Sequence, residues 1–245
     1  MQVALLTVGD EILTGDIENT NATWLARQLT ERGASVVRIL TVPDDEALIE
    51  RTVREWSDAF DAVVVTGGLG GTHDDVTMDA VAAAFDRPLV LDEEAEAHVE
   101  RRMATYRERH PEHAERYPEP QIDPADWASL PEGSRPLIID DGLSPGCAIG
   151  NVYVFPGVPQ EMKAMFDAVA GEFGGDAVSE TLYTPAPEGA LTGEIDAVRE
   201  RFDVAVGSYP SRSTHNRIKV VGTDEGEVAA AIAWLRERVD VVEPK

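Results

Sequence analysis

The stretch 63–77, VVVTGGLGGTHDDVT, limits the folds open to this chain more than any other segment. The preceding residues 61–66 (DAVVVT) are apolar on both faces, which is typical of a central strand in a parallel sheet. Four glycines follow within five residues, and a helix is predicted at 74–85. Ligands of parallel α/β sheets bind beyond the carboxyl ends of the strands, so this loop is a candidate binding site.

Strands and helices alternate along the first 110 residues. Residues 45–58, for example, place Leu48, Ile49, Val53 and Trp56 on one helical face. This alternation predicts an α/β fold with a largely parallel sheet. Besides 61–66 and 74–85, the predicted elements are strands at 3–8 and 35–41 and helices at 20–32, 45–58 and 92–109.

The alternation of predicted strands and helices changes twice further along the chain. Six prolines in 110–136 predict a long excursion over the surface, followed by a hairpin, a strand and a helix at 137–149, 152–155 and 159–171. Beyond Gly174 a compact β-α-β-β-α unit is predicted. Its elements are strands at 177–183, 204–209 and 216–222 and helices at 189–201 and 225–238. We therefore expect two domains, 1–175 and 176–245.

Composition and charge exclude several classes of protein. No apolar run approaches the roughly 20 residues that span a bilayer, and the N-terminus resembles a first strand, not a signal peptide. The single cysteine, Cys147, lacks a basic neighbour and is predicted to be a buried, unreactive residue, which fits a cytoplasmic protein. No membrane partner is expected.

The charge balance is extreme. Acidic residues number 46 and basic residues 21, giving a net charge of −25, and only Lys163, Lys219 and Lys245 are lysines. This balance argues against nucleic acid as a partner, because phosphate contacts need a basic surface. The acids are spread along the whole chain, so we interpret them as an adaptation to a high-salt (halophilic) cytoplasm.

The glycine loop suits a phosphate. Glycines at a strand end let backbone N–H groups approach an anion, and the following helix N-terminus adds a favourable field. The loop differs from a dinucleotide-binding fingerprint, because His73 stands where the third glycine belongs. It also lacks the lysine of a P-loop.

The polar residues after the glycines have two interpretations. Thr72 and Asp75 form a T-x-x-D pattern, which is a capping box for the helix at 74–85, and Asp74 would favour the helix dipole. Alternatively, Asp74 and Asp75 hold Mg²⁺ beside the phosphates, as hard oxygen ligands for a hard ion. The two interpretations are compatible.

Two further glycine-bearing loops follow strands. VGDEILTG (8–15) leads into a segment with Asn19 and Asn21, which either cap a helix or contact a ligand. FPGVPQEM (155–162) either forms a simple Pro-Gly turn before a helix or contributes to a site. Three such loops at the carboxyl ends of three strands favour one shared site.

These motifs resemble a known family. GDEILTGDIENTN, TGGLGGTHDDVT and FPGVPQEM, in this order and spacing, are similar to the N-terminal domain of the CinA (competence/damage-inducible) proteins, within the molybdopterin-binding fold of MoaB and MogA. LPEG (130–133) and SPGCAIGN (144–151) agree, and VGSYPS (206–211) resembles the KH-like domain that follows in CinA proteins. The resemblance implies a three-layer molybdopterin-binding-like domain with a mostly parallel sheet, then a small α+β KH-like domain. Gly71 departs from the family's usual proline.

The resemblance also implies a function. Related N-terminal domains hydrolyse the diphosphate of ADP-ribose, so Asp74 and Asp75 would hold a divalent metal (Mg²⁺, Mn²⁺ or Co²⁺, with K⁺ left open), and Glu11 would be a further catalytic carboxylate. The amidohydrolase domain of full-length CinA has no counterpart in these residues, so its activity is not implied. The implied ligand contacts are Gly9, Asn19, Asn21, Thr66, Gly67, Gly68, Leu69, Gly70, Gly71, Thr72, Thr77, Pro156, Gly157 and Glu161.

Two other functions remain open from the sequence. The same loop and aspartates would serve the binding or adenylylation of molybdopterin, so the small-molecule partner is a nucleotide or a pterin phosphate. The third hypothesis is that the chain is a non-catalytic binding module. RNA is disfavoured because 176–245 lacks the GXXG loop of KH domains. Relatives of this fold associate, so a homo-oligomer, such as a dimer, is expected.

Overall fold

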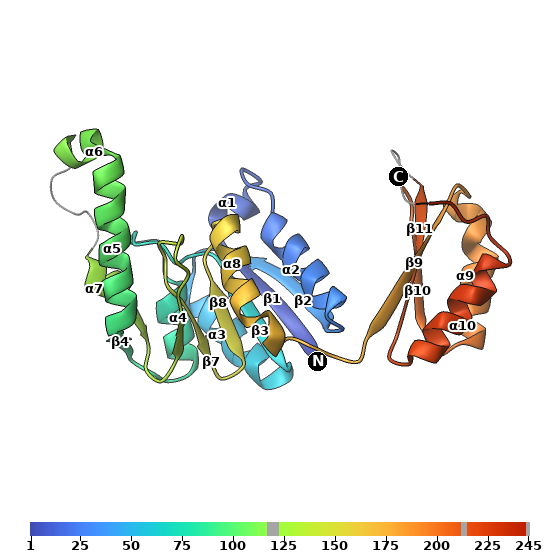
Figure 1. Ribbon diagram of the computed structural model, residues 1–245. Helices are drawn as coiled ribbons and strands as arrows, with labels where there is room; N and C mark the ends of the chain where they lie inside the picture. Colours follow the sequence, from blue (N-terminus) through green and yellow to red (C-terminus); the bar gives the residue numbers. More distant parts are fainter. Residues whose placement is uncertain (117–122, 212–214, 244–245) are drawn as a thin grey trace. The chain divides into compact units, whose positions relative to one another are not determined.

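The computed structural model describes residues 1–116, 123–211 and 215–243. The chain divides into two compact units: Met1–Gln28 with Val36–Phe173, and Leu29–Ser35 with Gly174–Lys245 (Figure 1). Each unit has a hydrophobic core of its own. Among the described residues, no helix combines the length and the apolarity needed to cross a membrane.

A six-stranded sheet forms the centre of the first unit, in the order β2-β1-β3-β8-β7-β6. β1 pairs with β3 and β3 with β8 in parallel, whereas β7 and β6 add antiparallel strands at one edge. The mostly parallel α/β fold expected from the sequence is therefore confirmed. The strands are β1 (Gln2–Val8), β2 (Ser35–Val42), β3 (Ala62–Thr66), β6 (Arg135–Leu137), β7 (Gly146–Ile149) and β8 (Val152–Phe155).

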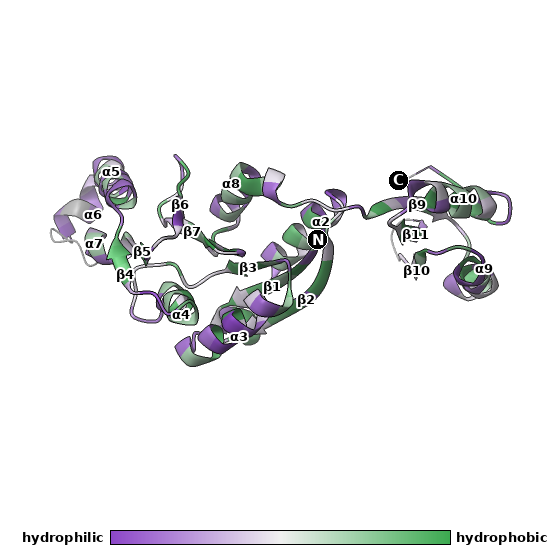
Figure 2. Cartoon of the chain, turned by 90° about the horizontal axis from the view of Figure 1, so that it is seen from below, coloured by the Kyte–Doolittle hydropathy of each residue, from purple (hydrophilic) through white to green (hydrophobic). Residues whose placement is uncertain are grey.

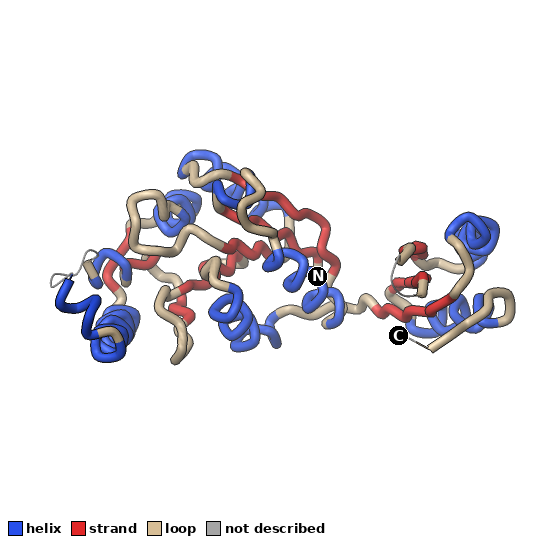
Figure 3. The backbone as a smooth tube through the Cα atoms, turned by 90° about the horizontal axis from the view of Figure 1, so that it is seen from above, coloured by secondary structure: helices blue, strands red, loops and turns tan. Residues whose placement is uncertain are grey.

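Helices cover both faces of this sheet, which completes three layers (Figure 3). α2 and α8 lie on one face, where Trp24 and Phe166 meet edge to face at 5.5 Å, and α3 and α4 lie on the other. Purple and green bands alternate along α3 in Figure 2, as expected for a helix with one apolar side. The helices are α1 (Asp10–Leu13), α2 (Thr20–Glu31), α3 (Glu46–Ala59), α4 (Thr77–Ala84) and α8 (Pro159–Val169), with the 3₁₀ turn η1 (Ala170–Glu172) after α8.

Local sequence accounts for these elements. The Asp45 side chain caps α3 by accepting a 2.9 Å hydrogen bond from the Leu48 amide, and Ile49, Val53 and Trp56 are buried, as the periodicity predicts. All five residues of β3 are buried, as expected for a central strand. Cys147 is also buried, and burial raises the pKa of its thiol to about 12, so it belongs to the core.

Two predictions about this unit need correction. α4 begins at Thr77, not at residue 74, and its N-cap Val76 makes no side-chain cap. The proline-rich region is not a bare excursion, because its described residues include two helices, a three-residue strand and the start of β6. The hairpin expected at 137–149 is confirmed, since β6 and β7 follow one another and pair antiparallel. The additional elements are β4 (Leu89–Leu91), α5 (Glu93–Arg109), α6 (Pro111–Arg116), α7 (Pro124–Trp127) and β5 (Ser129–Pro131), with β4 and β5 paired antiparallel.

The second unit has the predicted β-α-β-β-α order. Its three strands form an antiparallel sheet in the order β10-β11-β9, and both helices pack on one face of it. Leu182, Ile218 and Leu235 are among the fully buried residues of its core. The elements are β9 (Val178–Thr184), α9 (Glu188–Arg201), β10 (Ala205–Tyr209), β11 (Asn216–Gly222) and α10 (Glu225–Arg236).

Candidate functional site

Three parallel strands of the first unit end side by side. Thr7 of β1 pairs with Thr66 of β3, and Thr66 pairs with Phe155 of β8, so the three following loops leave the same edge of the sheet. The Gly67 amide donates a 3.2 Å hydrogen bond to the Phe155 carbonyl, which ties two of these loops together. The sequence motifs at 8–15, 66–77 and 155–162 therefore meet at one rim.

A cavity of about 440 Å³ lies at this rim. Its volume falls within the usual range for small-molecule sites, and it is lined by all three loops and the start of α2. The lining residues are Thr7, Val8, Glu11, Ile12, Ile17, Glu18, Asn19, Thr20, Asn21, Thr66, Gly67, Gly68, Leu69, Gly70, Asp75, Ser144, Pro156, Gly157, Val158 and Pro159.

The glycines of this loop are required for steric reasons. Gly67 and Gly68 have φ angles of 98° and 64°, in the left-handed region that favours glycine. A Cβ atom on Gly67 would collide with the Val8 carbonyl, and one on Gly68 would collide with the Thr77 hydroxyl. The backbone of the loop is therefore packed directly against β1 and α4.

Asp75 holds this loop closed. Its Oδ1 accepts a 2.7 Å hydrogen bond from the Gly70 amide, and its Oδ2 accepts from the Thr72 amide (3.1 Å) and the Thr72 hydroxyl (2.6 Å). Three of the roughly four acceptor positions of the carboxylate are thus occupied. Thr72 and Asp75 do pair, but they close the glycine loop instead of capping α4, which starts two residues later.

Three buried oxygens around the loop have no hydrogen-bond partner. They are Asn21 Oδ1, Thr66 Oγ1 and Thr77 Oγ1. The Asn21 side chain is held in place by its Nδ2, which donates a 2.8 Å hydrogen bond to the Gly157 carbonyl. Asn21 and Thr66 line the cavity, whereas Thr77 lies behind the loop against Gly68. Buried polar atoms are usually paired in folded proteins, so the two oxygens at the cavity are candidate positions for ligand contacts.

Asn19 has a structural role. Its Oδ1 accepts a 3.1 Å hydrogen bond from the Ala22 amide, which caps α2, and its Nδ2 donates to the hydroxyls of Thr7 and Thr41. Of the two asparagines singled out by the sequence, Asn21 keeps a free oxygen at the cavity and Asn19 fixes the start of the helix.

Four carboxylates gather beside the glycine loop. Asp44 Oδ2 accepts a 3.0 Å hydrogen bond from the Asp10 amide. Burial, together with the negative charges of Asp10, Glu11 and Asp74, raises the pKa of Asp44 above its ordinary value. Glu11 lines the cavity, whereas Asp74 is exposed and does not line it. Such mutual repulsion is relieved when a cation binds.

Several residues expected at the site lie away from the cavity lining. Gly9 precedes α1 and donates to the Val42 carbonyl. Glu161 lies in the first turn of α8, where its Oε2 is buried without a partner near Gly142. The expected residues outside the lining are Gly9, Gly71, Thr72, Asp74, Thr77 and Glu161; those within it are Glu11, Asn19, Asn21, Thr66, Gly67, Gly68, Leu69, Gly70, Asp75, Pro156 and Gly157.

The sequence did not single out Trp127 or Ser144. Trp127 Nε1 donates a 2.8 Å hydrogen bond to the Leu69 carbonyl, so α7 supports the glycine loop from 58 residues away. No local pattern could reveal a contact of this range. Ser144 belongs to the SPGCAIGN motif and lines the cavity.

An open groove of about 460 Å³ adjoins the cavity and shares Glu18, Asn19 and Thr20 with it. Trp24, Arg27 and Lys163 also line this groove, and the Lys163 ammonium lies 5.6 Å from the centre of the Trp24 ring. Among the described residues neither cation has a carboxylate within 4 Å.

The fold and this cavity define a protein of the molybdopterin-binding class. Residues 4–173 match the family of the probable molybdopterin binding domain, which includes every residue of the cavity. The chain belongs to this family, and its relatives place it with the CinA-like proteins.

The relatives differ in length. A protein of Archaeoglobus fulgidus is 36% identical over 239 residues, covering 97% of both chains. A CinA-like protein of Frankia casuarinae is 42% identical over 172 residues, which are 69% of this chain and 39% of that one. The crystal structure of CinA from Thermoplasma acidophilum superposes with a TM-score of 0.58 and 33% identity, covering 70% of this chain and 97% of that chain.

The expected KH-like identity of the second unit needs correction. Residues 176–243 match the middle domain of FAD synthase instead. Periodicity predicted the β-α-β-β-α order, and the structure confirms that order. Many small α+β domains share it, however, so the order alone does not identify the domain. One short segment, VGSYPS, is too little to distinguish among them.

Proposed function

We propose that the first unit hydrolyses the diphosphate bond of a nucleoside diphosphate ester, such as ADP-ribose, with a divalent metal ion. The observation that carries the proposal is the glycine loop at the cavity, with unpartnered buried oxygens beside it and carboxylates at its edge. Backbone amides of Gly67 to Gly70 would bind the phosphates. The Thr66 hydroxyl would donate to a phosphate oxygen, and Asn21 Oδ1 would accept from a sugar hydroxyl.

The carboxylates beside the loop fit a hard divalent ion. Glu11, Asp44 and Asp74 offer oxygen ligands of the kind that Mg²⁺, Mn²⁺ and Co²⁺ accept. Among the described residues these groups do not bring three donor atoms within 4.8 Å of one another. A metal ion would therefore be shared with the substrate phosphates, as Mg²⁺ commonly is, and K⁺ would offset further charge. When bound, the metal would neutralise phosphate charge and activate water.

The adjoining groove would hold the other half of the substrate. Trp24 offers an aromatic face, and Arg27 and Lys163 offer positive charge in a chain whose net charge is −25. A nucleobase or sugar phosphate beyond the diphosphate would match this lining. The match of the second unit to the FAD synthase middle domain supports a substrate that contains a nucleoside diphosphate.

The test is a screen of phosphate release from ADP-ribose, FAD, NAD and related esters, coupled to a phosphatase. Mg²⁺, Mn²⁺ and Co²⁺ are compared in high KCl. We expect turnover that chelation abolishes and that Asn21→Ala reduces. If no ester is cleaved with any metal by folded protein, hydrolysis is rejected.

Molybdopterin binding is the second candidate function, because the matching family is described as a probable molybdopterin binding domain. The same amides would bind the single phosphate of a pterin, and Asn21 would contact the ring. Titration with a pterin phosphate, followed by quenching of tryptophan fluorescence from Trp24, distinguishes the candidates. Tight binding together with no cleavage of diphosphate esters favours this second function.

A further inference from the structure

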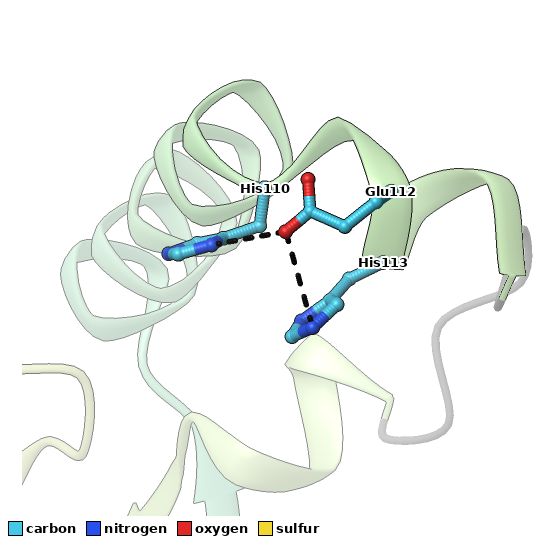
Figure 4. Close-up of side chains that lie close together, drawn as sticks. All are labelled: His110, Glu112 and His113. Atoms are coloured by element: carbon cyan, nitrogen blue, oxygen red, sulfur yellow. Dashed lines mark ion pairs between the residues drawn. The ribbon is translucent and has the colours of Figure 1, made fainter.

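A second cluster of chemically active side chains lies at the junction of α5 and α6. α5 ends at Arg109, its C-cap His110 donates from the amide to the Tyr106 carbonyl, and Pro111 begins α6. A residue before proline is pushed out of the helical region, and His110 has φ −127° and ψ 64°. The resulting bend brings His110, Glu112 and His113 to one side of the junction (Figure 4).

Their donor atoms face one another. His110 Nδ1 lies 3.5 Å from Glu112 Oε1, and His113 Nε2 lies 4.0 Å from the same oxygen. All three donor atoms lie within 4.8 Å of one another, and no other three His, Cys, Asp or Glu residues among the described ones do so. With metal–ligand bonds of about 2.0–2.1 Å, tetrahedral ligand atoms are roughly 3.3 Å apart. Small side-chain rotations would bring this set to that spacing.

Tyr106 orients one of the ligands. Its Oη lies 2.8 Å from His113 Nδ1, which leaves Nε2 of the same ring facing Glu112. The Tyr106 ring also packs against His110, with the ring centres 4.6 Å apart. A hydrogen bond to the far nitrogen of a histidine is the usual support of a metal-binding imidazole, because it fixes the tautomer and the ring orientation.

A plain ion pair explains this cluster less well. It would require protonated imidazoles, and the side chains of His110, Glu112 and His113 are 45%, 64% and 53% exposed, so its contribution would be small. Neutral imidazoles, by contrast, are common metal ligands. We propose that His110, Glu112 and His113 bind one divalent transition-metal ion, with His113 oriented by Tyr106.

The donor set selects the class of metal. Two imidazoles and one carboxylate suit Zn²⁺, Ni²⁺ or Co²⁺, whereas Mg²⁺ prefers a shell of oxygen atoms. This ion is separate from the metal proposed for the cavity, because none of its ligands lines that cavity. A bound ion would link the end of α5 to α6.

The test is calorimetric titration of the full chain with Zn²⁺ in about 1 M KCl, where weak binding to scattered surface acids is screened. Excess Mg²⁺ is added to the titration so that sites made only of oxygen ligands are already occupied. We expect one tight Zn²⁺ site per chain, weakened at least about 100-fold in the His110→Ala/His113→Ala double variant. Tyr106→Phe should weaken binding about 10- to 100-fold, the usual effect of losing such a supporting bond.

Glu115 provides the matched control. It is an exposed acid in the same helix, so Glu115→Gln changes the net charge as Glu112→Gln does without touching the proposed ligands. Of these two glutamate variants, only Glu112→Gln should weaken Zn²⁺ binding and change the visible spectrum of bound Co²⁺. Circular dichroism verifies that each variant is folded. Equal binding by the wild type and the folded double variant, or no tight site in the wild type, overturns the proposal.

Discussion

Asp75 is the residue that most directly shapes the candidate site. Its three hydrogen bonds to Gly70 and Thr72 close the glycine loop, so its role in the structure is to position backbone amides. An asparagine side chain has one acceptor oxygen and one NH₂ group, and the NH₂ group would face a donor. Asp75→Asn should therefore lower the free energy of unfolding by about 1–2 kcal/mol and abolish turnover. Denaturant unfolding and the phosphate-release assay measure the two effects.

Asp74→Asn is the matched comparison. Asp74 is exposed, and the variant makes the same change of charge one residue away. We expect its stability to stay within about 0.5 kcal/mol of the wild type, because exposed side chains contribute little. Full activity in both variants would show that neither aspartate is needed beyond the local fold.

Asp44 gives a prediction that depends on pH. Burial first, and then the charges of Asp10, Glu11 and Asp74, raise its pKa in the folded state. The pKa of this carboxyl group in the unfolded chain is 3.8. A carboxyl group whose pKa is raised by folding stabilises the folded state when the pH is below the unfolded pKa, and this stabilisation is lost as the pH rises through the folded pKa. In the presence of a chelator, Asp44→Asn should therefore stabilise the protein at pH 7, by less than about 1 kcal/mol.

Melting curves at several pH values test this. The gain from Asp44→Asn should vanish below pH 3.8 because Asp44 is then neutral in both states. The Asp10 amide keeps an acceptor in the variant. A variant that is less stable than the wild type at pH 7 would mean that the hydrogen bond from Asp10 outweighs the repulsion.

Residue types and loop positions could be predicted from the sequence, but individual contacts could not. The glycines after β3 and the two asparagines at the start of α2 do line one cavity, as their positions in the sequence predict. The division of roles between Asn19, which caps a helix, and Asn21, which keeps a free oxygen, depends on the distant partners Thr41 and Gly157. A single sequence does not reveal such partners.

At the scale of elements, strong periodicity was a reliable guide. α3, β3 and the whole second unit follow their apolar patterns closely. The start of α4 was placed too early, because T-x-x-D is also the pattern of a closed loop. β4 and β5 were missed, since three-residue strands with prolines beside them carry almost no periodic signal.

The short helix α7 provides a test at this scale. Trp127 donates from Nε1 to the Leu69 carbonyl at 2.8 Å and thereby links α7 to the glycine loop. Trp127→Phe keeps an aromatic ring but removes the donor, so it should cost about 1 kcal/mol of stability. It should also raise the KM of the proposed reaction more than it lowers kcat, because the loop is loosened while the carboxylates stay in place.

Steady-state kinetics and denaturant unfolding check this prediction. Trp56→Phe is a suitable control, since Trp56 lies on the buried face of α3 and does not line the cavity. That variant should lose stability without a change in KM. An unchanged KM in Trp127→Phe would show that the loop keeps its shape without α7.

For the whole molecule, the dominant property is charge. A net charge of −25 with three lysines crowds like charges on the folded chain, and unfolding relieves the repulsion. The ion pairs found among the described residues are mostly exposed, so they offset little of it. The Debye length is roughly 30 Å at 0.01 M salt and roughly 3 Å at 1 M, so molar salt leaves only immediate neighbours interacting.

The melting temperature should therefore rise steadily from low salt to molar KCl. Any hydrolysis of an anionic substrate should become faster over the same range, because screening eases its approach to an acidic surface. Sodium chloride at equal ionic strength separates general screening from a specific effect of K⁺ at the site. The other explanation of the charge is that it only keeps the protein soluble. A melting temperature that stays flat or falls between about 0.05 M and 2 M KCl would favour that explanation and reject the adaptation to high salt.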